Sequence, residues 1–332
     1  MEHVCIIAEA GVNHNGDYDT AIQMVKAAKK AGVDYIKFQT FVPEKLVSEF
    51  AQKAEYQKRE TGPGESQLDM LRKLTLTNGE FFEIKKYCDE LGIGFISTPF
   101  DFESIDFLEN LNLDFWKIPS GEITNMPFLE KLARTKRRIV MSTGMSDMKE
   151  IKDAVALLEN NGAADIILLH CNTQYPTPFC DVNLKAMNEI QMETGKKVGY
   201  SDHTIGIEIP IAAVAMGAVV IEKHFTLDRK MEGPDHKASL EPDELYNMVL
   251  SIRNIEKAMG DGVKIPSESE AANKDIIRKS IVAKNDIKIG DIFSVDNITT
   301  KRPGDGISPM YWYEVLGKRA NRNFNKDEKI TL

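Results

Sequence analysis

Short apolar runs of strand length alternate with amphipathic helical segments through the first 260 residues, and this repetition limits the possible folds more than any other feature of the chain. Eight strand-then-helix units are predicted. The strands are too apolar to alternate between a buried and an exposed face, which is typical of parallel sheets covered on both sides. We therefore predict an α/β protein with a closed (β/α)8 TIM barrel rather than an open doubly wound sheet.

The expected elements follow one another at short intervals. Strands are predicted over 4–9, 34–40, 94–98, 115–119, 138–143, 165–171, 198–202 and 218–224. Helices are predicted over 20–31, 78–91, 102–111, 127–134, 147–160, 182–194, 208–216 and 242–259. The polar stretch from 43 to 76 is too long for an ordinary connection, which indicates a functional loop or lid.

The chain changes character after the last predicted helix. Residues 1–260 are assigned to the barrel. Residues 261–275 are rich in Gly, Ser, Glu and Lys and are interpreted as a linker. In residues 276–332 short apolar runs alternate with tight turns, which predicts a small β-rich domain.

Composition narrows the class of function. The formal net charge of −9 argues against nucleic acid as a partner, because phosphate backbones attract basic surfaces. No run is apolar and long enough for a membrane span, and the N-terminus lacks a signal peptide pattern, so we expect a cytoplasmic protein. The cysteines show no CxxC spacing and are interpreted as reduced structural thiols: Cys5, Cys88, Cys171 and Cys180.

Two predicted strands end in histidine, within YSDHT (200–204) and EKHF (222–225). The carboxyl ends of barrel strands meet at one mouth, where the active sites of such barrels lie. His203 and His224 are therefore candidates to hold one divalent metal, with other positions left for water and substrate. The alternative is that both are core histidines whose hydrogen bonds are satisfied.

Other polar residues recur at the predicted strand ends. Lys37 and Lys117 stand inside apolar runs and are candidate anchors for an anion, unless they are surface lysines whose stems cover strand edges. Hydroxyl donors for phosphate oxygens are Ser120, Ser142, Thr173 and Ser201. Candidates for acid/base work or for binding sugar hydroxyls are Glu9, Glu122 and Glu222, each of which could instead be an ion-pair partner.

At these residues the chain resembles the sialic acid synthase family, whose members join phosphoenolpyruvate to an N-acylated mannosamine. The similar segments run in order through nearly the whole chain: IAEAGVNHNG (7–16), KFQTF (37–41), STPFD (97–101), KIPSGE (117–122), STGM (142–145), HCNTQYPTP (170–178), YSDHT (200–204), EKHFT (222–226) and GPDHKASLEP (233–242). The C-terminal part, with KRPGDGISP (301–309), is similar to the antifreeze-like (SAF) domain of these synthases.

The resemblance implies roles for individual residues. It implies that His203 and His224 bind a divalent metal, usually manganese, with magnesium or cobalt as alternatives. It implies a phosphoenolpyruvate site made of Lys37, Lys117, Ser120, Ser142, Thr173 and Ser201, in which position 173 varies within the family. The sugar and the condensation chemistry would be served by Glu9, Glu122, Tyr175, Asp235 and Arg302. Our own hypothesis for the activation of water prefers Glu122, with Glu9 and Glu222 as alternatives. In the family the arginine reaches the active site of a partner subunit, which implies a domain-swapped homodimer.

The expected activity is that of an N-acetylneuraminate synthase. Such an enzyme condenses phosphoenolpyruvate with N-acetylmannosamine and water, with a metal, and releases phosphate by C–O cleavage. A first alternative is a legionaminic or pseudaminic acid synthase that uses a 6-deoxy diacetamido hexose. A second alternative, from another class, is a non-catalytic glycan-binding protein, which would leave the histidine pair and the two lysines unexplained.

Overall fold

The structure, a computed structural model, describes residues 3–48, 50–61, 64 and 66–332. The chain divides into two compact units, Met1–Asp261 and Gly262–Leu332. Among the described residues, no helix is both long enough and apolar enough to cross a membrane.

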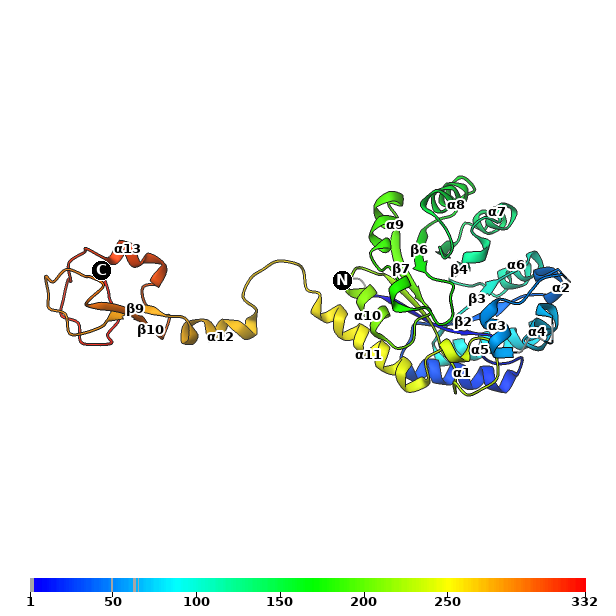
Figure 1. Cartoon of the computed structure of the whole chain (residues 1–332), viewed down its shortest axis with the longest axis horizontal. Coiled ribbons are helices and arrows are strands. Elements are labelled where there is room, and N and C mark those ends of the chain that lie inside the picture. The colour runs from blue at the N-terminus through cyan, green and yellow to red at the C-terminus, as the bar shows by residue number, and fades with distance from the viewer. Residues whose placement is uncertain (1–2, 49, 62–63, 65) are drawn as a thin grey trace. The chain divides into compact units, whose positions relative to one another are not determined.

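Eight parallel strands form one sheet in the first unit, in the order β3-β2-β1-β8-β7-β6-β5-β4. The strands at the two ends of this order, β3 and β4, pack side by side, and Figure 1 shows helices around the strands. The predicted TIM barrel is thus confirmed. Its strands are β1 (Cys5–Gly11), β2 (Tyr35–Thr40), β3 (Gly94–Pro99), β4 (Phe115–Ile118), β5 (Arg138–Ser142), β6 (Ile166–Cys171), β7 (Lys197–Asp202) and β8 (Val220–His224).

The outer helices begin where the sequence supplies capping residues. Asp17 caps the first helix by accepting a hydrogen bond from the backbone of Thr20, and Thr77 and Glu80 form a capping box at α5. The ninth helix begins later than predicted, because a short 3-10 turn at Phe179–Asp181 precedes it. These helices are α1 (Tyr18–Ala31), α5 (Asn78–Leu91), α6 (Phe102–Glu109), α7 (Met126–Arg134), α8 (Met148–Asn160), α9 (Ala186–Thr194), α10 (Glu208–Ala215) and α11 (Pro242–Ala258).

The polar stretch after β2 is helical where the sequence indicated a loop. It contains α2 (Pro43–Leu46), α3 (Glu55–Thr61) and α4 (Gln67–Lys73). Arg72 Nε on α4 donates a 2.8 Å hydrogen bond to Glu44 Oε1 on α2. Because the helices are short and largely polar, their periodicity was too weak to predict them.

Alternation along the strands fills the barrel in layers. Side chains that point outward pack beneath the helices and form the largest core. The inward-pointing side chains nearer the strand starts form a separate apolar layer, made of Ile7, Ile96, Phe115, Val140, Ile167, Leu169 and Val220. Two residues further along the same strands stand Glu9, Thr98, Lys117, Ser142, Cys171 and Glu222. The interior of the barrel is therefore filled by apolar side chains nearer the strand starts and by polar side chains nearer the strand ends.

The second unit has its own small core. It contains α12 (Glu268–Ile277), an antiparallel pair β9 (Ser280–Ala283) and β10 (Ile298–Lys301), and α13 (Trp312–Val315). Its buried residues include Ile281, Phe293, Val315 and Phe324. Much of the segment interpreted as a linker belongs to helix α12, which starts with a capping box between Ser267 and Glu270. The two-strand sheet agrees with the prediction of a small C-terminal β domain.

Candidate active site

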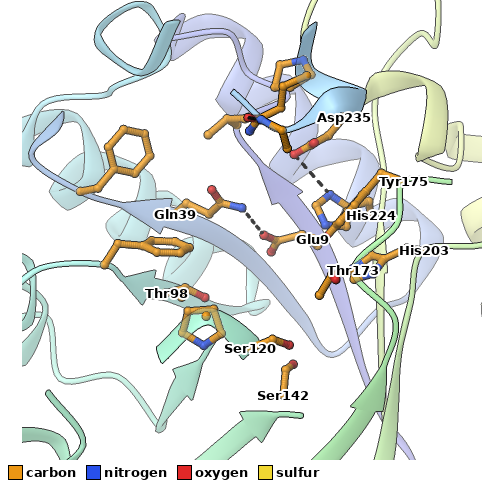
Figure 2. Close-up of a pocket in the computed structure, with 18 of the residues that line it drawn as sticks. Glu9, Gln39, Thr98, Ser120, Ser142, Thr173, Tyr175, His203, His224 and Asp235 are labelled. Atoms are coloured by element: carbon orange, nitrogen blue, oxygen red, sulfur yellow. Dashed lines mark hydrogen bonds and ion pairs between the residues drawn. The ribbon is translucent and has the colours of Figure 1, made fainter. Parts of the chain in front are cut away.

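A cavity of about 660 Å³ opens at the carboxyl ends of the barrel strands. Figure 2 shows side chains from several strands pointing into it. Most residues predicted for the site line this cavity: Glu9, Lys37, Lys117, Ser120, Ser142, Thr173, Tyr175, Ser201, His203, Glu222, His224 and Asp235. Segments more than 200 residues apart in the sequence therefore meet in one pocket.

Hydrogen-bonded ladders set the positions of the charged groups. Glu9 on β1 is paired in register with Lys37 on β2 and with His224 on β8. Ser201 on β7 is paired in register with Glu222 on β8. Because the hydrogen bonds of the sheet hold the neighbouring backbones in place, the Cα atoms of these residues have fixed relative positions.

The two lysines are buried, with 4% exposure for Lys37 and 2% for Lys117, so they are not surface residues. Lys37 Nζ lies 2.7 Å from Glu9 Oε2 and 3.9 Å from Glu222 Oε2. Lys117 Nζ lies 3.7 Å from Glu222 Oε1. Charges this deep must be paired to be tolerated, and the two carboxylates supply the pairing.

The two glutamates of this cluster differ in protonation. Burial raises the pKa of Glu9 to about 7, although Lys37 opposes the shift and Glu222 adds to it. Burial also acts to raise the pKa of Glu222, but Lys117 and Lys37 outweigh it and the pKa falls below its ordinary value. Burial lowers the pKa of Lys117, and Glu222 opposes that change. The charged carboxylate is therefore favoured at Glu222, while the pKa of Glu9 lies near neutral pH, so its carboxyl group can take up or release a proton there.

Hydroxyl groups surround the lysines. Ser142 Oγ accepts a 2.7 Å hydrogen bond from Lys117 Nζ, and Ser201 Oγ donates to Glu222 Oε1 at 3.1 Å. Ser120 Oγ accepts from the backbone N–H of Gly144 at 2.9 Å. A Cβ at Gly144 would lie 2.8 Å from both Ser120 Oγ and Thr173 Cγ2, so only glycine fits here. Together the lysines and hydroxyls form a compact cradle for an anion.

The rings of the two strand-end histidines lie next to each other in the pocket, with centroids 5.4 Å apart. Both are buried, and burial lowers the pKa of His203 to about 4 and that of His224 well below its ordinary value. His203 Nδ1 is hydrogen-bonded to the backbone carbonyl of Asn172, which leaves its Nε2 lone pair available. Nδ1 of His224 is buried and has no hydrogen-bond partner among the described residues.

These features suit a metal ligand pair. A metal binds the neutral imidazole, and a buried ring nitrogen without a partner is a usual position for such a bond. The ring separation is within the range for two imidazoles on one ion, since each metal–nitrogen bond is about 2.0–2.1 Å. In the described part of the chain, no group of three His, Cys, Asp or Glu side chains is arranged to hold a metal. The remaining ligands would have to be water or substrate oxygens.

Tyr175 and Asp235 border the histidines, as Figure 2 shows. The Tyr175 ring centroid lies 4.0 Å from that of His203, and Asp235 Oδ2 lies 4.0 Å from His224 Nδ1. Burial raises the pKa of Asp235 to about 6. Both residues stand next to the histidine pair, where an acceptor substrate would meet a metal.

One residue of the first unit that was predicted for the site is not in the pocket lining. Glu122 ends a 3-10 turn, Ser120–Glu122, and its carboxylate accepts a 2.5 Å hydrogen bond from Asn125. In a 3-10 turn residues two positions apart point in different directions, so Ser120 faces the pocket and Glu122 does not. Arg302 belongs to the second unit, where its Nε donates a 2.9 Å hydrogen bond to the carbonyl of Ile277.

The pocket also contains residues that sequence reasoning did not assign to the site. Gln39 Nε2 donates to Glu9 Oε1 at 3.2 Å, and Thr98 Oγ1 accepts from Lys37 Nζ at 3.0 Å. Cys171 is a free thiol that also lines the pocket, 3.1 Å from Ser120 Oγ. The rule of alternate residues could have found Gln39, because it lies two positions after Lys37 on the same strand.

A buried ion pair lies behind the histidines. Asp202 and Lys223 precede His203 and His224 in the sequence, so their side chains point the opposite way, toward the helices. Both side chains have no exposure, and Lys223 Nζ is hydrogen-bonded to Asp202 Oδ2. It also donates to the backbone carbonyl of Thr204. This pair ties the ends of β7 and β8 together.

Comparison with known proteins shows which protein family the chain is similar to. The chain matches the family model described as NeuB family over residues 24–264 and the model described as SAF domain over residues 278–332. It is 53% identical to N,N'-diacetyllegionaminic acid synthase from Campylobacter jejuni, with 99% of each chain covered. It is 36% identical to N-acetylneuraminate-9-phosphate synthase from Homo sapiens, with 99% of this chain and 92% of the relative covered.

A solved structure of an N-acetylneuraminic acid (sialic acid) synthetase from Leptospira borgpetersenii, in complex with citrate, is also similar. It superposes with a TM-score of 0.74 at 34% sequence identity. The match covers 82% of this chain and 90% of that structure.

Proposed function

Since the chain belongs to the NeuB family of phosphoenolpyruvate-dependent sugar-acid synthases, we propose that it is an N,N'-diacetyllegionaminic acid synthase. Its acceptor would be a 6-deoxy diacetamido hexose. Identity of 53% to a legionaminic acid synthase, against 36% to an N-acetylneuraminate-9-phosphate synthase, favours this acceptor over the N-acetylmannosamine first expected from the sequence. The observation that carries the reaction type is the meeting of two buried lysines and two neutral histidines in one pocket.

Phosphoenolpyruvate would bind in the cradle of lysines and hydroxyls. Lys37 and Lys117 are charged donors in a dry site, and Ser120, Ser142 and Ser201 add neutral donors next to them. Charge-assisted hydrogen bonds to phosphate and carboxylate oxygens are strong in such surroundings. The cradle would hold the enol methylene carbon in a fixed position for attack.

The acceptor aldehyde would lie beside the histidine pair. NeuB-family enzymes use a divalent metal, and the proposed ion, manganese, would polarise the aldehyde oxygen when held by His203 and His224. Tyr175 and Asp235 border the same place and would orient the sugar. The methylene carbon of phosphoenolpyruvate then forms a C–C bond with the aldehyde carbon as the C=O π bond breaks, and the aldehyde oxygen takes a proton from solvent to become a hydroxyl.

A water molecule completes the reaction. Attack leaves a cationic centre at the former enol carbon, and the water oxygen bonds to it while a carboxylate takes the water proton. Glu9 is the proposed acceptor of that proton, because Glu222 lies between both lysines and Ser201 whereas Glu122 lies outside the pocket lining. The C–O bond to phosphate then breaks with its electron pair leaving on phosphate, the new hydroxyl gives its proton to the phosphate, and an α-keto acid remains.

Two measurements test this function. Phosphate release with phosphoenolpyruvate, manganese and each candidate sugar should give the highest kcat/KM with the 6-deoxy diacetamido hexose. A higher value with N-acetylmannosamine would return the acceptor to the first expectation. In isotope-labelled water the label should be absent from the released phosphate, and label in the phosphate would disprove C–O cleavage.

The domain-swapped homodimer and the role of Arg302 stay predictions, and a mixing experiment tests both. Arg302→Ala and Lys117→Ala should each have strongly reduced activity alone. If Arg302 serves the site of a partner subunit, co-refolded mixtures of the two variants should regain part of the activity. If it serves its own subunit, or if the protein is monomeric, every site in the mixture lacks either Arg302 or Lys117, and activity stays low.

A further inference from the structure

One side of the pocket carries a separate hydrophobic cluster, although Glu55, Gln57 and Gln67 also line the cavity there. The cluster is distinct from the outer core and from the apolar layer inside the barrel. All of its members line the same cavity as the lysines and histidines. We call it the apolar wall, and it consists of buried Val12, Phe41, Met70, Leu71 and Leu74 with partly buried Leu46, Val47 and Phe100.

The apolar wall is held in place on several sides. The rings of Phe41 and Phe100 pack edge to face with centroids 6.3 Å apart. The backbone N–H of Val42 donates a 2.6 Å hydrogen bond to Asp101, which anchors the start of α2 to the end of β3. The bond between Arg72 and Glu44 ties α4 to α2. The wall is therefore a formed surface that faces the cavity before any substrate arrives.

The strand order places this wall relative to the reacting groups. Val12, Phe41 and Phe100 follow β1, β2 and β3; of these strands β1 neighbours β8, and β3 packs beside β4. The histidines stand at the ends of β7 and β8, and Lys117 and Ser142 stand on β4 and β5. A sugar whose aldehyde lies beside the histidines and the anion cradle can extend its far end over β1 toward the wall.

We propose that the apolar wall selects the acceptor by receiving the methyl groups of the 6-deoxy diacetamido hexose. This inference rests on the proposed function and assigns its specificity to the apolar wall. The 6-deoxy sugar ends in a methyl group and carries a second acetamido methyl. N-acetylmannosamine has hydroxyl groups in their place, which would be buried against the wall without hydrogen-bond partners. An apolar surface of this kind discriminates against an added hydroxyl by about 100-fold in kcat/KM.

The test introduces polar atoms into the wall without changing its volume much. Val47→Thr adds one hydroxyl to a partly buried side chain, and Leu71→Asn adds an amide to a buried one. For each variant, kcat/KM is measured with the 6-deoxy diacetamido hexose and with N-acetylmannosamine, together with the KM for phosphoenolpyruvate. Val155→Thr is the matched control, because Val155 is buried on α8 away from the cavity.

The proposal expects the ratio of the two kcat/KM values to move toward N-acetylmannosamine. The ratio should fall about 3- to 10-fold in Val47→Thr and at least about 10-fold in Leu71→Asn, with the KM for phosphoenolpyruvate unchanged. The ratio should not move in Val155→Thr. A ratio that stays at the wild-type value in both wall variants, or an equal loss with both sugars, would overturn the proposal.

This design separates the wall from the proposed function. If wild-type protein itself prefers N-acetylmannosamine, the proposed acceptor is wrong. The wall would still be supported if the two variants shift the ratio further toward that sugar. If wild-type protein prefers the 6-deoxy diacetamido hexose but the variants do not change the preference, the function stands and the wall does not select.

Discussion

The charged side of the pocket and the apolar wall come from different parts of the chain and are fixed by different forces. The charged side consists of inward-pointing residues on strands such as Glu9, Lys37 and Glu222, whose backbones are held by parallel ladders. The apolar wall comes from the ends of β1, β2 and β3 and from inserted helices, and it is held by hydrophobic contact. The proposed reaction chemistry is therefore tied to the register of the barrel strands, whereas the proposed selection of the acceptor depends on the packing of segments that follow the strands.

Of all the substitutions considered, the removal of a histidine on the charged side should cause the largest loss of turnover. His203→Ala or His224→Ala deletes one of two protein ligands for the proposed metal, and turnover should fall by about 10³-fold or more. Calorimetric titration with manganese should show weakened binding, with unchanged circular dichroism.

His170 supplies the matched control for this prediction. It is a histidine at the end of the neighbouring strand β6, but its Nε2 is hydrogen-bonded to the carbonyl of Val182 and it does not line the cavity. His170→Gln should keep manganese binding. Full activity in His203→Ala or His224→Ala would remove the metal from the proposed mechanism.

The charged side should also depend on the ion pair behind it. Lys223→Met leaves Asp202 buried without its charge partner, which should cost about 3–5 kcal/mol of unfolding free energy. For a domain of this size that corresponds to a fall in Tm of about 10 °C. The double variant Asp202→Asn with Lys223→Met removes both charges and should recover part of the loss. An unchanged Tm in the single variant would show that the pair does not stabilise the strand ends.

A smaller and more selective effect is expected at the anion cradle. Lys117→Ala removes a charge-assisted hydrogen-bond donor, which is worth about 1.5–3 kcal/mol, so kcat/KM for phosphoenolpyruvate should fall about 10- to 100-fold. Steady-state kinetics with each substrate varied in turn should show less change in the KM of the sugar. If the sugar is affected more than phosphoenolpyruvate, the two halves of the site are assigned the wrong way round.

The smallest effect is expected on the apolar wall. Leu46 is only partly buried, so Leu46→Ala should lose about 1 kcal/mol of contact with the sugar, a change of about fivefold in its KM. Manganese affinity and the KM for phosphoenolpyruvate should stay at wild-type values. A parallel loss of phosphoenolpyruvate binding would mean that the two sides of the pocket are coupled, and the comparison drawn above would fail.

The sequence alone was informative where a local rule fixes the outcome. Apolar runs of strand length with helices between them predicted the barrel, because both faces of a parallel sheet must be buried. Lys37 and Lys117 were identifiable because a charge inside an apolar run is costly unless it serves a site. His203 and His224 were identifiable because each ends such a run, and strand ends share one mouth of a barrel.

Other features of the site required the tertiary structure. Glu122 was the first choice for activating water, but the 3-10 turn that carries it directs its carboxylate to Asn125. The stretch from 43 to 76 was interpreted as a loop or lid, whereas its leucines and methionine form one wall of the cavity. Such outcomes depend on which residues far apart in the chain come into contact, and no local periodicity records them.

The sequence by itself therefore determined the barrel, the level at which its polar groups stand, and most of the side chains that line the pocket. These follow from the two-residue period of a strand, which is a property of the local backbone. Only the tertiary structure decided the strand order that brings β8 beside β1, the pairing of Lys37 and Lys117 with Glu9 and Glu222, and the apolar wall. These features depend on packing between segments that are distant in the sequence. The free energy of that packing is set by which side chains come into contact.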